Sequence, residues 1–166
     1  PLTVETTTNI VLLPKVPMTP RFADRRVGFF TTPHIYFNDK QQAVETRDFV
    51  HRWRLEPKPE DIEKYKRGEL VEPAKPIVFY IDPATPAQWR EEIKAGVFDW
   101  QEAFEAAGFK NAVVAKDAPT DDPDFDIDDA RYSVITYAAS QQANAMGPSV
   151  VDPRSGEIIE ADVVWW

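Results

Sequence analysis

A run of acidic residues is the first place where side chains of one kind gather closely enough to bind an ion. Residues 121–129 read Asp-Asp-Pro-Asp-Phe-Asp-Ile-Asp-Asp and carry six carboxylates. Alternating carboxylates suit calcium, which takes about six to eight oxygen ligands. The stretch lacks the EF-hand pattern, because the sixth position counted from Asp124 is not Gly and the twelfth is Ile135 rather than Glu. We therefore expect a solvated loop that caps the strand after it, with calcium binding as the alternative.

Zinc chemistry and nucleophilic catalysis have few candidate residues. His34 and His51 are the two histidines, and neither has a second His or a carboxylate at the helical spacing of a zinc site. The sequence has no cysteine, no phosphate-binding loop and no Gly-x-Ser-x-Gly turn. It accordingly predicts no catalytic residue, no metal ligand and no cofactor within positions 1–166.

The composition of the chain argues against two kinds of partner, nucleic acid and a membrane-spanning environment. The formal net charge is −9 at pH 7, which argues against a nucleic-acid partner because binding to phosphates needs a basic face. Hydrophobic residues make up 43% of the chain, which is enough for a packed core. No apolar run approaches the roughly 20 residues that cross a bilayer, so no membrane span is expected.

The tryptophans raise the question of a carbohydrate platform. Trp89 and Trp100 recur on one face of an expected helix, which favours core packing over glycan binding. Trp165 and Trp166 are adjacent in an expected strand and must face opposite ways. A self-contained glycan- or calcium-binding module without enzymatic activity remains the alternative function.

The second half of the sequence contains a clear helix. Thr85 is expected as its N-cap, with a capping box to Gln88 and Pro86 in the first helical position. Apolar residues then recur at spacings of three and four, and Gly108 follows the last of them, as a C-terminal cap does. One uninterrupted helix is therefore expected over Ala87–Ala107.

Strands flank this helix and follow it. They are expected at Ile77–Ile81, Ala112–Ala115 and Tyr132–Ala138, with a final hairpin of Met146–Val151 and Glu157–Trp165. A strand, a helix and a strand in this order predict a parallel pair. We expect an α+β fold with a mixed sheet of about five strands and the long helix packed on one face.

Residues 1–72 show less regular secondary-structure patterns than the rest of the sequence. Prolines interrupt their first part, and short strands are expected at Val27–Thr31, His34–Phe37 and Arg47–Leu55, with a surface helix at Glu60–Arg67. We expect an irregular extension over 1–72 that wraps a domain formed by 73–166. The chain stops on Trp165 and Trp166 within an apparent strand, so we expect it to be a piece of a longer protein.

Four long stretches of the sequence carry a family resemblance: Lys75-Pro-Ile-Val-Phe-Tyr-Ile-Asp-Pro-Ala-Thr-Pro-Ala-Gln-Trp89, Asp99-Trp-Gln-Glu-Ala-Phe-Glu-Ala-Ala-Gly-Phe-Lys-Asn-Ala112, Asp129-Ala-Arg-Tyr-Ser-Val-Ile135 and Asp152-Pro-Arg-Ser-Gly-Glu-Ile158. They resemble a family of large bacterial zinc-dependent metallopeptidases with a metzincin-like catalytic domain. The stretches Pro17–Arg21, Arg26–Phe30 and Arg52–Leu55 are similar to the segment before that domain. The resemblance covers the chain from about Leu12 to its end.

The resemblance implies the sheet half of a peptidase domain. In such enzymes a third strand, an edge strand and a fifth strand precede a helix that carries His-Glu-x-x-His, and this helix binds zinc and activates water. The sequence ends where that helix would begin, so the fragment itself is expected to be inactive. The resemblance also implies a peptide or protein substrate for the parent and a periplasmic or secreted location.

One functional element is expected to lie within the fragment. By position, Ala143–Ser149 corresponds to the edge strand at the rim of the cleft, where an extended peptide adds by backbone hydrogen bonds. The predicted substrate-binding residues are Ala145, Met146, Gly147, Pro148 and Ser149. The alternative is an irregular strand entry shaped by Gly147 and Pro148.

The resemblance also implies that one face of the sheet packs against the catalytic helix in the parent protein. This face is expected to hold Val134, Thr136 and some of Ile159, Val163 and Trp165. Without that helix the face would be bare, covered by the N-terminal region or buried in a second copy. A non-native dimer through the exposed sheet is therefore expected.

Overall fold

The structure is a computed structural model and describes residues 2–4 and 6–166. The chain divides into two compact units. Unit 1 comprises Pro1–Ile10, Leu55–Pro148 and Glu160–Trp166, and unit 2 comprises Val11–Arg54 and Ser149–Ile159. The domain boundary expected between positions 72 and 73 stays a prediction.

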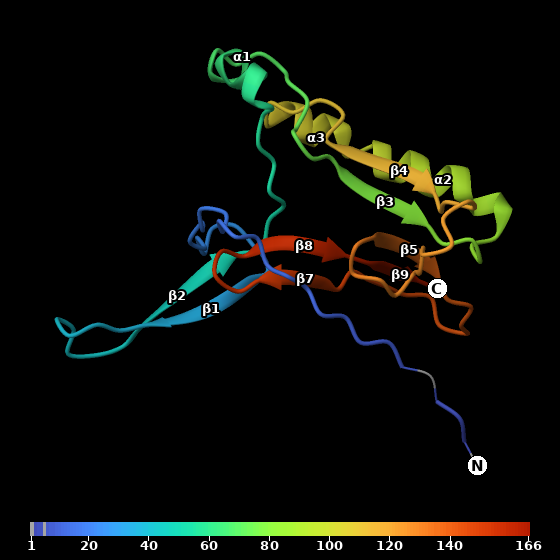
Figure 1. The fold of residues 1–166 in the computed structure, drawn as a ribbon, viewed down its shortest axis with the longest axis horizontal. Coiled ribbons are helices and arrows are strands. Elements are labelled where there is room, and N and C mark those ends of the chain that lie inside the picture. Colours follow the sequence, from blue (N-terminus) through green and yellow to red (C-terminus); the bar gives the residue numbers. More distant parts are fainter. Residues whose placement is uncertain (1, 5) are drawn as a thin grey trace. The chain divides into compact units, whose positions relative to one another are not determined.

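Unit 1 is built on a five-stranded sheet with the order β4-β3-β5-β9-β6 (Figure 1). The parallel strands are β3 (Ile77–Ile81), β4 (Val113–Asp117), β5 (Ser133–Tyr137) and β9 (Val163–Trp165). The fifth strand, β6 (Ala145–Met146), runs antiparallel to β9. The expected α+β class with a mixed five-stranded sheet is confirmed, and so is the parallel pairing of β3 with β4.

The long helix between β3 and β4 consists of two consecutive segments, α2 (Ala87–Phe98) and α3 (Gln101–Ala106). Asp99 and Trp100 between them keep right-handed helical angles, but the Trp100 N–H donates to the Val97 carbonyl, three residues back, at 3.3 Å. This tighter turn interrupts the α-helical ladder. The expected helix is therefore present over 87–106, with one interruption that the sequence pattern does not reveal.

The expected capping box at the start of α2 is wrong. Pro86 is the N-cap residue and makes no side-chain cap, and Thr85 Oγ1 has no hydrogen-bond partner among the described residues. The buried Asp82 carboxylate instead accepts the Ala84 N–H at 2.8 Å and closes a turn before the helix. Arg90 then donates to the Thr85 carbonyl at 2.9 Å, which fixes the turn to the first helical turn.

One face of the sheet lies against α2. Trp165 on β9 pairs in register with Tyr137 on β5, and the two rings are 4.7 Å apart. The Trp165 ring also meets Trp89 of α2 edge-on, with centroids 6.5 Å apart. Lys94 of α2 forms an ion pair with Asp117 of β4 at 2.7 Å. The Trp165 side chain at the end of β9 therefore faces the helix.

The opposite face of the sheet is covered in part by the acidic loop. Val134 lies three residues before Tyr137 on β5, so its side chain points to the other face of the sheet. On that face it pairs in register with Tyr80 of β3. The Tyr80 ring contacts Phe125 and Tyr132, each with centroids 5.6 Å away, and Val134 is fully buried. Strand alternation puts Val134 and Thr136 on this face and Val163 and Trp165 on the other, so neither Val163 nor Trp165 is among the residues that share the face expected to receive a helix.

A small apolar cluster supports the other end of unit 1. Val71, Phe109 and Ala112 are buried together, and Leu55 and Phe104 pack against them. The short helices η1 (Pro59–Asp61) and α1 (Ile62–Lys66) precede this cluster and agree with the expected helix at 60–67. None of the helices in the described part of the chain is long and apolar enough to cross a membrane.

Unit 2 contains two antiparallel pairs of strands. β1 (Thr31–Tyr36) pairs with β2 (Glu45–Val50), and β7 (Ser149–Asp152) pairs with β8 (Glu157–Ala161), whose last two residues belong to unit 1. The hairpin expected around residues 152–156 is present, and Gly156 has a φ of 74°. The strand expected at 27–31 is wrong except for Thr31, which begins β1.

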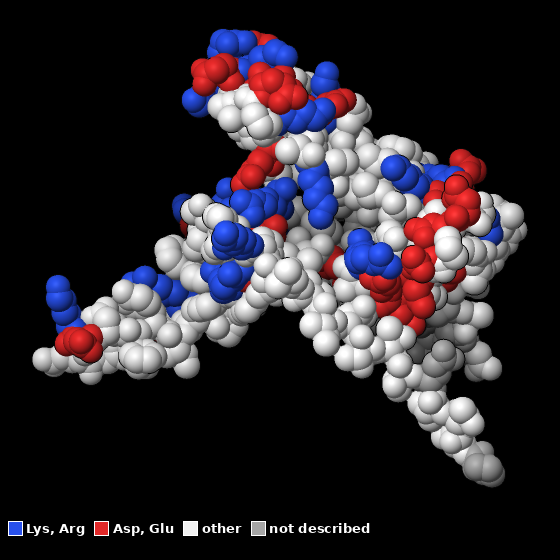
Figure 2. Space-filling model, viewed as in Figure 1, with Lys and Arg blue, Asp and Glu red and all other residues white. Residues whose placement is uncertain are grey.

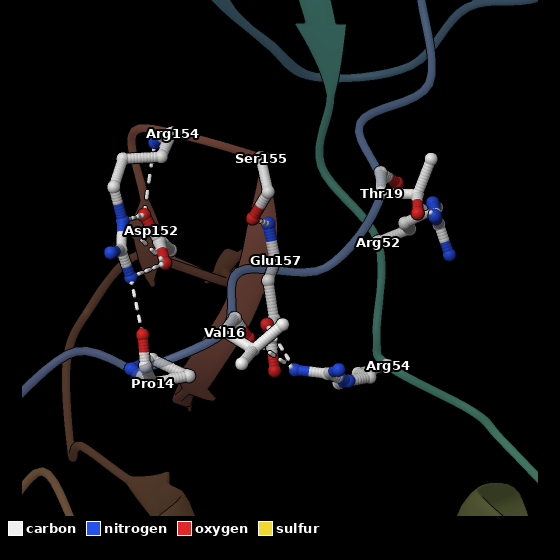
Figure 3. Close-up of polar contacts among 9 residues, drawn as sticks. All are labelled: Pro14, Val16, Thr19, Arg52, Arg54, Asp152, Arg154, Ser155 and Glu157. Atoms are coloured by element: carbon white, nitrogen blue, oxygen red, sulfur yellow. Dashed lines mark hydrogen bonds and ion pairs between the residues drawn. The ribbon is translucent and has the colours of Figure 1, made fainter.

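Three arginines hold the proline-rich segment of unit 2 (Figure 3). Arg154, Arg54 and Arg52 donate to the backbone carbonyls of Pro14, Val16 and Thr19, at 2.7, 3.1 and 2.6 Å respectively. A proline-rich chain has few N–H groups with which to join a sheet, so side-chain donors fix its carbonyls instead. Arg54 also lies 3.6 Å from the buried carboxylate of Glu157.

Candidate functional site

The strand β6 lies at the edge of the sheet in unit 1. Its one neighbour in the sheet is β9, and no other strand of the described residues pairs with its outer side. Residues 145–148 are exposed, and Met146 has 54% of its surface accessible. An exposed edge presents backbone N–H and C=O groups to a further extended chain.

The antiparallel ladder decides which backbone groups of β6 face outward. Asn144 and Trp166 exchange two hydrogen bonds, at 2.8 and 2.9 Å, and the Pro148 carbonyl accepts the Asp162 N–H at 3.0 Å. Because alternate residues point to opposite sides of a strand pair, Met146 also faces β9. The N–H and C=O groups of Gly147, and the C=O of Ala145, therefore point away from the sheet.

The position of Pro148 matters for this edge. Its carbonyl points towards Asp162, so the N–H that proline lacks would also point inward. The proline thus leaves the outer side of Gly147 open. Of the five predicted residues, Ala145, Met146, Gly147 and Pro148 lie together in unit 1, whereas Ser149 begins β7 in unit 2.

Two acidic residues, buried Glu160 and partly buried Asp162, lie where β8 ends and β9 begins, and the sequence analysis did not single them out. Asp162 connects β8 to β9, and its carboxylate accepts the backbone N–H of Val134 at 2.9 Å. Glu160 is 7% exposed and shares a hydrogen bond with Asp162. Burial, followed by the charge and the hydrogen bond of Asp162, raises the pKa of Glu160 to about 7. The available signal in the sequence was that Glu160 and Asp162 lie between the apolar residues Ile158–Ile159 and Val163–Val164.

Three of the six carboxylates of the acidic loop bond to groups within or next to the loop. Asp122 and Asp126 each accept the backbone N–H two residues further on, the latter from Asp128 at 2.9 Å. Asp129 pairs with Arg131 at 2.6 Å, and hydrogen bonds from Arg131 lower the pKa of Asp129. Figure 2 shows the acidic side chains gathered on the visible surface of unit 1. Within residues 2–4 and 6–166, no three His, Cys, Asp or Glu side chains converge to hold a metal ion.

Both histidines of unit 2 have structural partners. The Nε2 atom of His51 lies 2.8 Å from the hydroxyl of Thr32. His34 contacts the carbonyl of Pro153 and packs on the Phe49 ring, with centroids 4.4 Å apart. Neither arrangement resembles a set of zinc ligands.

The tryptophans of the long helix are less buried than the sequence pattern predicts. Trp89 and Trp100 are 44% and 64% exposed. The expectation that both pack in the core is wrong, although the Trp89 ring still contacts Trp165 edge-on.

The chain therefore has an α+β fold with an open, mixed β-sheet and an exposed edge strand. Comparison with known proteins adds one similarity: residues 1–58 match the model of a family described as "Domain of unknown function (DUF5117)". The matched part includes β1 and β2. No curated protein and no solved structure matches the chain.

Proposed function

We propose that this chain is the sheet portion of the catalytic domain of a zinc-dependent metallopeptidase, and that β6 is the rim strand where an extended peptide substrate binds. The support comes from the residues that resemble this family and from the order of the strands. In the sheet of unit 1, β6 is the fourth strand along the chain, lies at one of the two edges and is the antiparallel strand. This single observation carries the proposal, because the resemblance implies a rim strand at this place.

The chemistry at β6 is that of strand addition. A peptide that runs antiparallel to β6 would donate to and accept from Gly147 and would donate to the Ala145 carbonyl. Gly147 adds no side chain near these groups, and Pro148 directs its own backbone inward. The outer edge therefore offers a short stretch of backbone that would bind an extended peptide through its backbone groups, independently of the peptide's sequence.

Zinc is implied by the resemblance, but the described side chains do not fit a zinc site. His34 and His51 are held by Pro153 and Thr32, and no metal-binding group of three forms among the described residues. In our proposal the zinc ligands and the water-activating Glu belong to a His-Glu-x-x-His helix supplied by a longer protein. The 166-residue chain by itself would be inactive.

The remaining features of the proposal concern location and association. The parent would act on peptides or proteins in the periplasm or outside the cell. The 166-residue chain would form a non-native dimer through sheet surface that the catalytic helix covers in the parent. Light scattering of this chain beside the longer protein tests that point, since only the former should dimerise.

The decisive experiment uses the longer protein that, in our proposal, contains this chain. A His-Glu-x-x-His sequence should follow Trp166 within roughly 50 residues, and a quenched fluorescent peptide should be cleaved in a chelator-sensitive way. Gly147→Pro removes the outward N–H of the rim and leaves the inward hydrogen bonds intact. We expect kcat/KM to fall about tenfold, which corresponds to roughly 1.4 kcal/mol of lost binding.

Met146→Ala is the matched control, because it removes an exposed side chain and keeps every backbone group of β6. Its kcat/KM should stay within about threefold of the parent value. Cleavage that survives the chelator contradicts the zinc assignment. An unchanged kcat/KM in Gly147→Pro contradicts the role of β6.

A further inference from the structure

Asp162 connects three strands of the sheet through two different groups. Its backbone N–H donates to the Pro148 carbonyl at the end of β6, at 3.0 Å. Its side-chain Oδ1 accepts the backbone N–H of Val134 in β5, at 2.9 Å. The residue before it adds a third bond, because the Ala161 N–H donates to Ser133 Oγ at 3.0 Å.

The bond to Val134 replaces a missing strand partner. The Ile135 carbonyl accepts the Asp82 N–H on the β3 side, so Val134, one residue earlier, points its N–H to the β9 side. On that side β9 begins only at Val163, opposite Ile135. Because Val134 is fully buried, its N–H would lack a partner without the Asp162 carboxylate.

Glu160 holds this carboxylate from behind. It is buried, and its carboxyl is hydrogen-bonded to Asp162. Its Oε1 atom has no partner elsewhere in the described part of the chain. The raised pKa of Glu160 is consistent with a proton held between the two carboxyl groups. The side chain of Asp162 is thereby fixed towards Val134.

We propose that Asp162, supported by Glu160, is the positioning residue that holds β6 in the sheet with its outer backbone groups presented to a peptide. The part of this inference that concerns a peptide rests on the proposed function. The part that concerns β6 does not. Loss of the Asp162 carboxylate frees the start of β5 and loosens the connection that fixes Pro148, so β6 loses its register against β9.

Amide hydrogen exchange of the 166-residue chain tests the positioning role directly. In the unmodified chain the amides of Val134, Met146 and Asp162 should exchange within about threefold of one another, because one local opening releases them all. In Asp162→Ala the amides of Val134 and Met146 should exchange at least about tenfold faster, while that of Phe79 between β4 and β5 is unchanged. Asp162→Asn should stay close to the unmodified chain, because its side-chain oxygen still accepts.

Asp126→Ala is the matched control, since Asp126 also caps a backbone N–H of unit 1 but lies in the acidic loop. It should leave the Val134 and Met146 amides unchanged. Unchanged exchange of Met146 in Asp162→Ala overturns the inference. If the Ala variant does not fold, the unmodified chain still tests the inference. An exchange rate of the Met146 amide more than about tenfold above that of the Val134 amide in that chain would overturn it.

A peptide measurement separates this inference from the proposed function. A capped five-residue peptide of alternating threonine and valine is titrated into the chain and into Asp162→Ala, with the Gly147 amide resonance as the signal. A shift that appears in the unmodified chain and is lost in the variant supports both. Faster Met146 exchange in the variant without any peptide shift supports the positioning role and contradicts the peptide site. A peptide shift that is equal in both chains contradicts the positioning role.

Discussion

The ionisation of Glu160 should leave a measurable mark on the stability of the chain. Its pKa in the folded state is about 7, against 4.5 for an ordinary Glu, and the first cause is burial. Between these two pH values the folded chain binds a proton that the unfolded chain has released. The free energy of unfolding therefore falls as the pH rises from about 4.5 to about 7, and this contribution is constant above that range.

The size of the effect follows from the shift. Each pKa unit is worth about 1.4 kcal/mol, so this shift corresponds to a loss of about 3 kcal/mol across the window. Glu160→Gln removes the ionisation but keeps a donor for Asp162. The free energy of unfolding of the variant minus that of the unmodified chain should therefore increase by about 3 kcal/mol between pH 4 and pH 8.

Urea unfolding followed by tryptophan fluorescence at a series of pH values measures this difference. Glu105→Gln, which removes an exposed carboxylate from α3, controls for the change in net charge. In that control the difference should not vary with pH by more than about 0.5 kcal/mol. A flat difference for Glu160→Gln as well would refute the account of a buried Glu160 carboxyl whose pKa is raised by burial and by Asp162.

Two further predictions concern unit 2 and the long helix. Arg54→Ala should lower the free energy of unfolding by about 2 kcal/mol, because it leaves the buried Glu157 carboxylate unpaired, and adding Glu157→Gln should recover about half of the loss in urea unfolding. Gly156→Ala should cost about 3 kcal/mol or more, because its φ is 74° and the new Cβ would lie 2.3 Å from the Val50 carbonyl oxygen. Gly96→Ala, with open space around it in α2, should instead stabilise by about 0.5–1 kcal/mol, and equal effects of the two substitutions would contradict this account.

The sequence was most informative where one local signal decided the structure. The apolar run at Ile77–Ile81 is long enough for a strand and too short for a helix, and β3 has those bounds. The periodicity after Pro86 predicted the helical stretch, because backbone hydrogen bonding in a helix is local. The edge position of β6 was expected from the resemblance and not from the spacing of its residues.

The sequence was least informative where a side chain is bonded to a distant part of the chain. Thr85 has the residue type and spacing of a helix cap, but the buried Asp82 closes the turn instead. Trp100 has the spacing of a core residue and is exposed, because periodicity gives the face of a helix and not what covers it. Asp162 bonds to Val134, 28 positions earlier, and no local pattern predicts that pair.

The features of β6 are best understood together with those of Asp162. A strand of two residues next to Gly147 and Pro148 is too short to attract another sheet, which is how natural proteins limit association at open edges. The same shortness leaves β6 with few backbone bonds of its own to hold it in place. Asp162 holds β6 in place with two groups: its carboxylate accepts a hydrogen bond from the buried start of β5, and its backbone N–H donates to Pro148. An edge that is both open and fixed is what strand addition by a peptide needs.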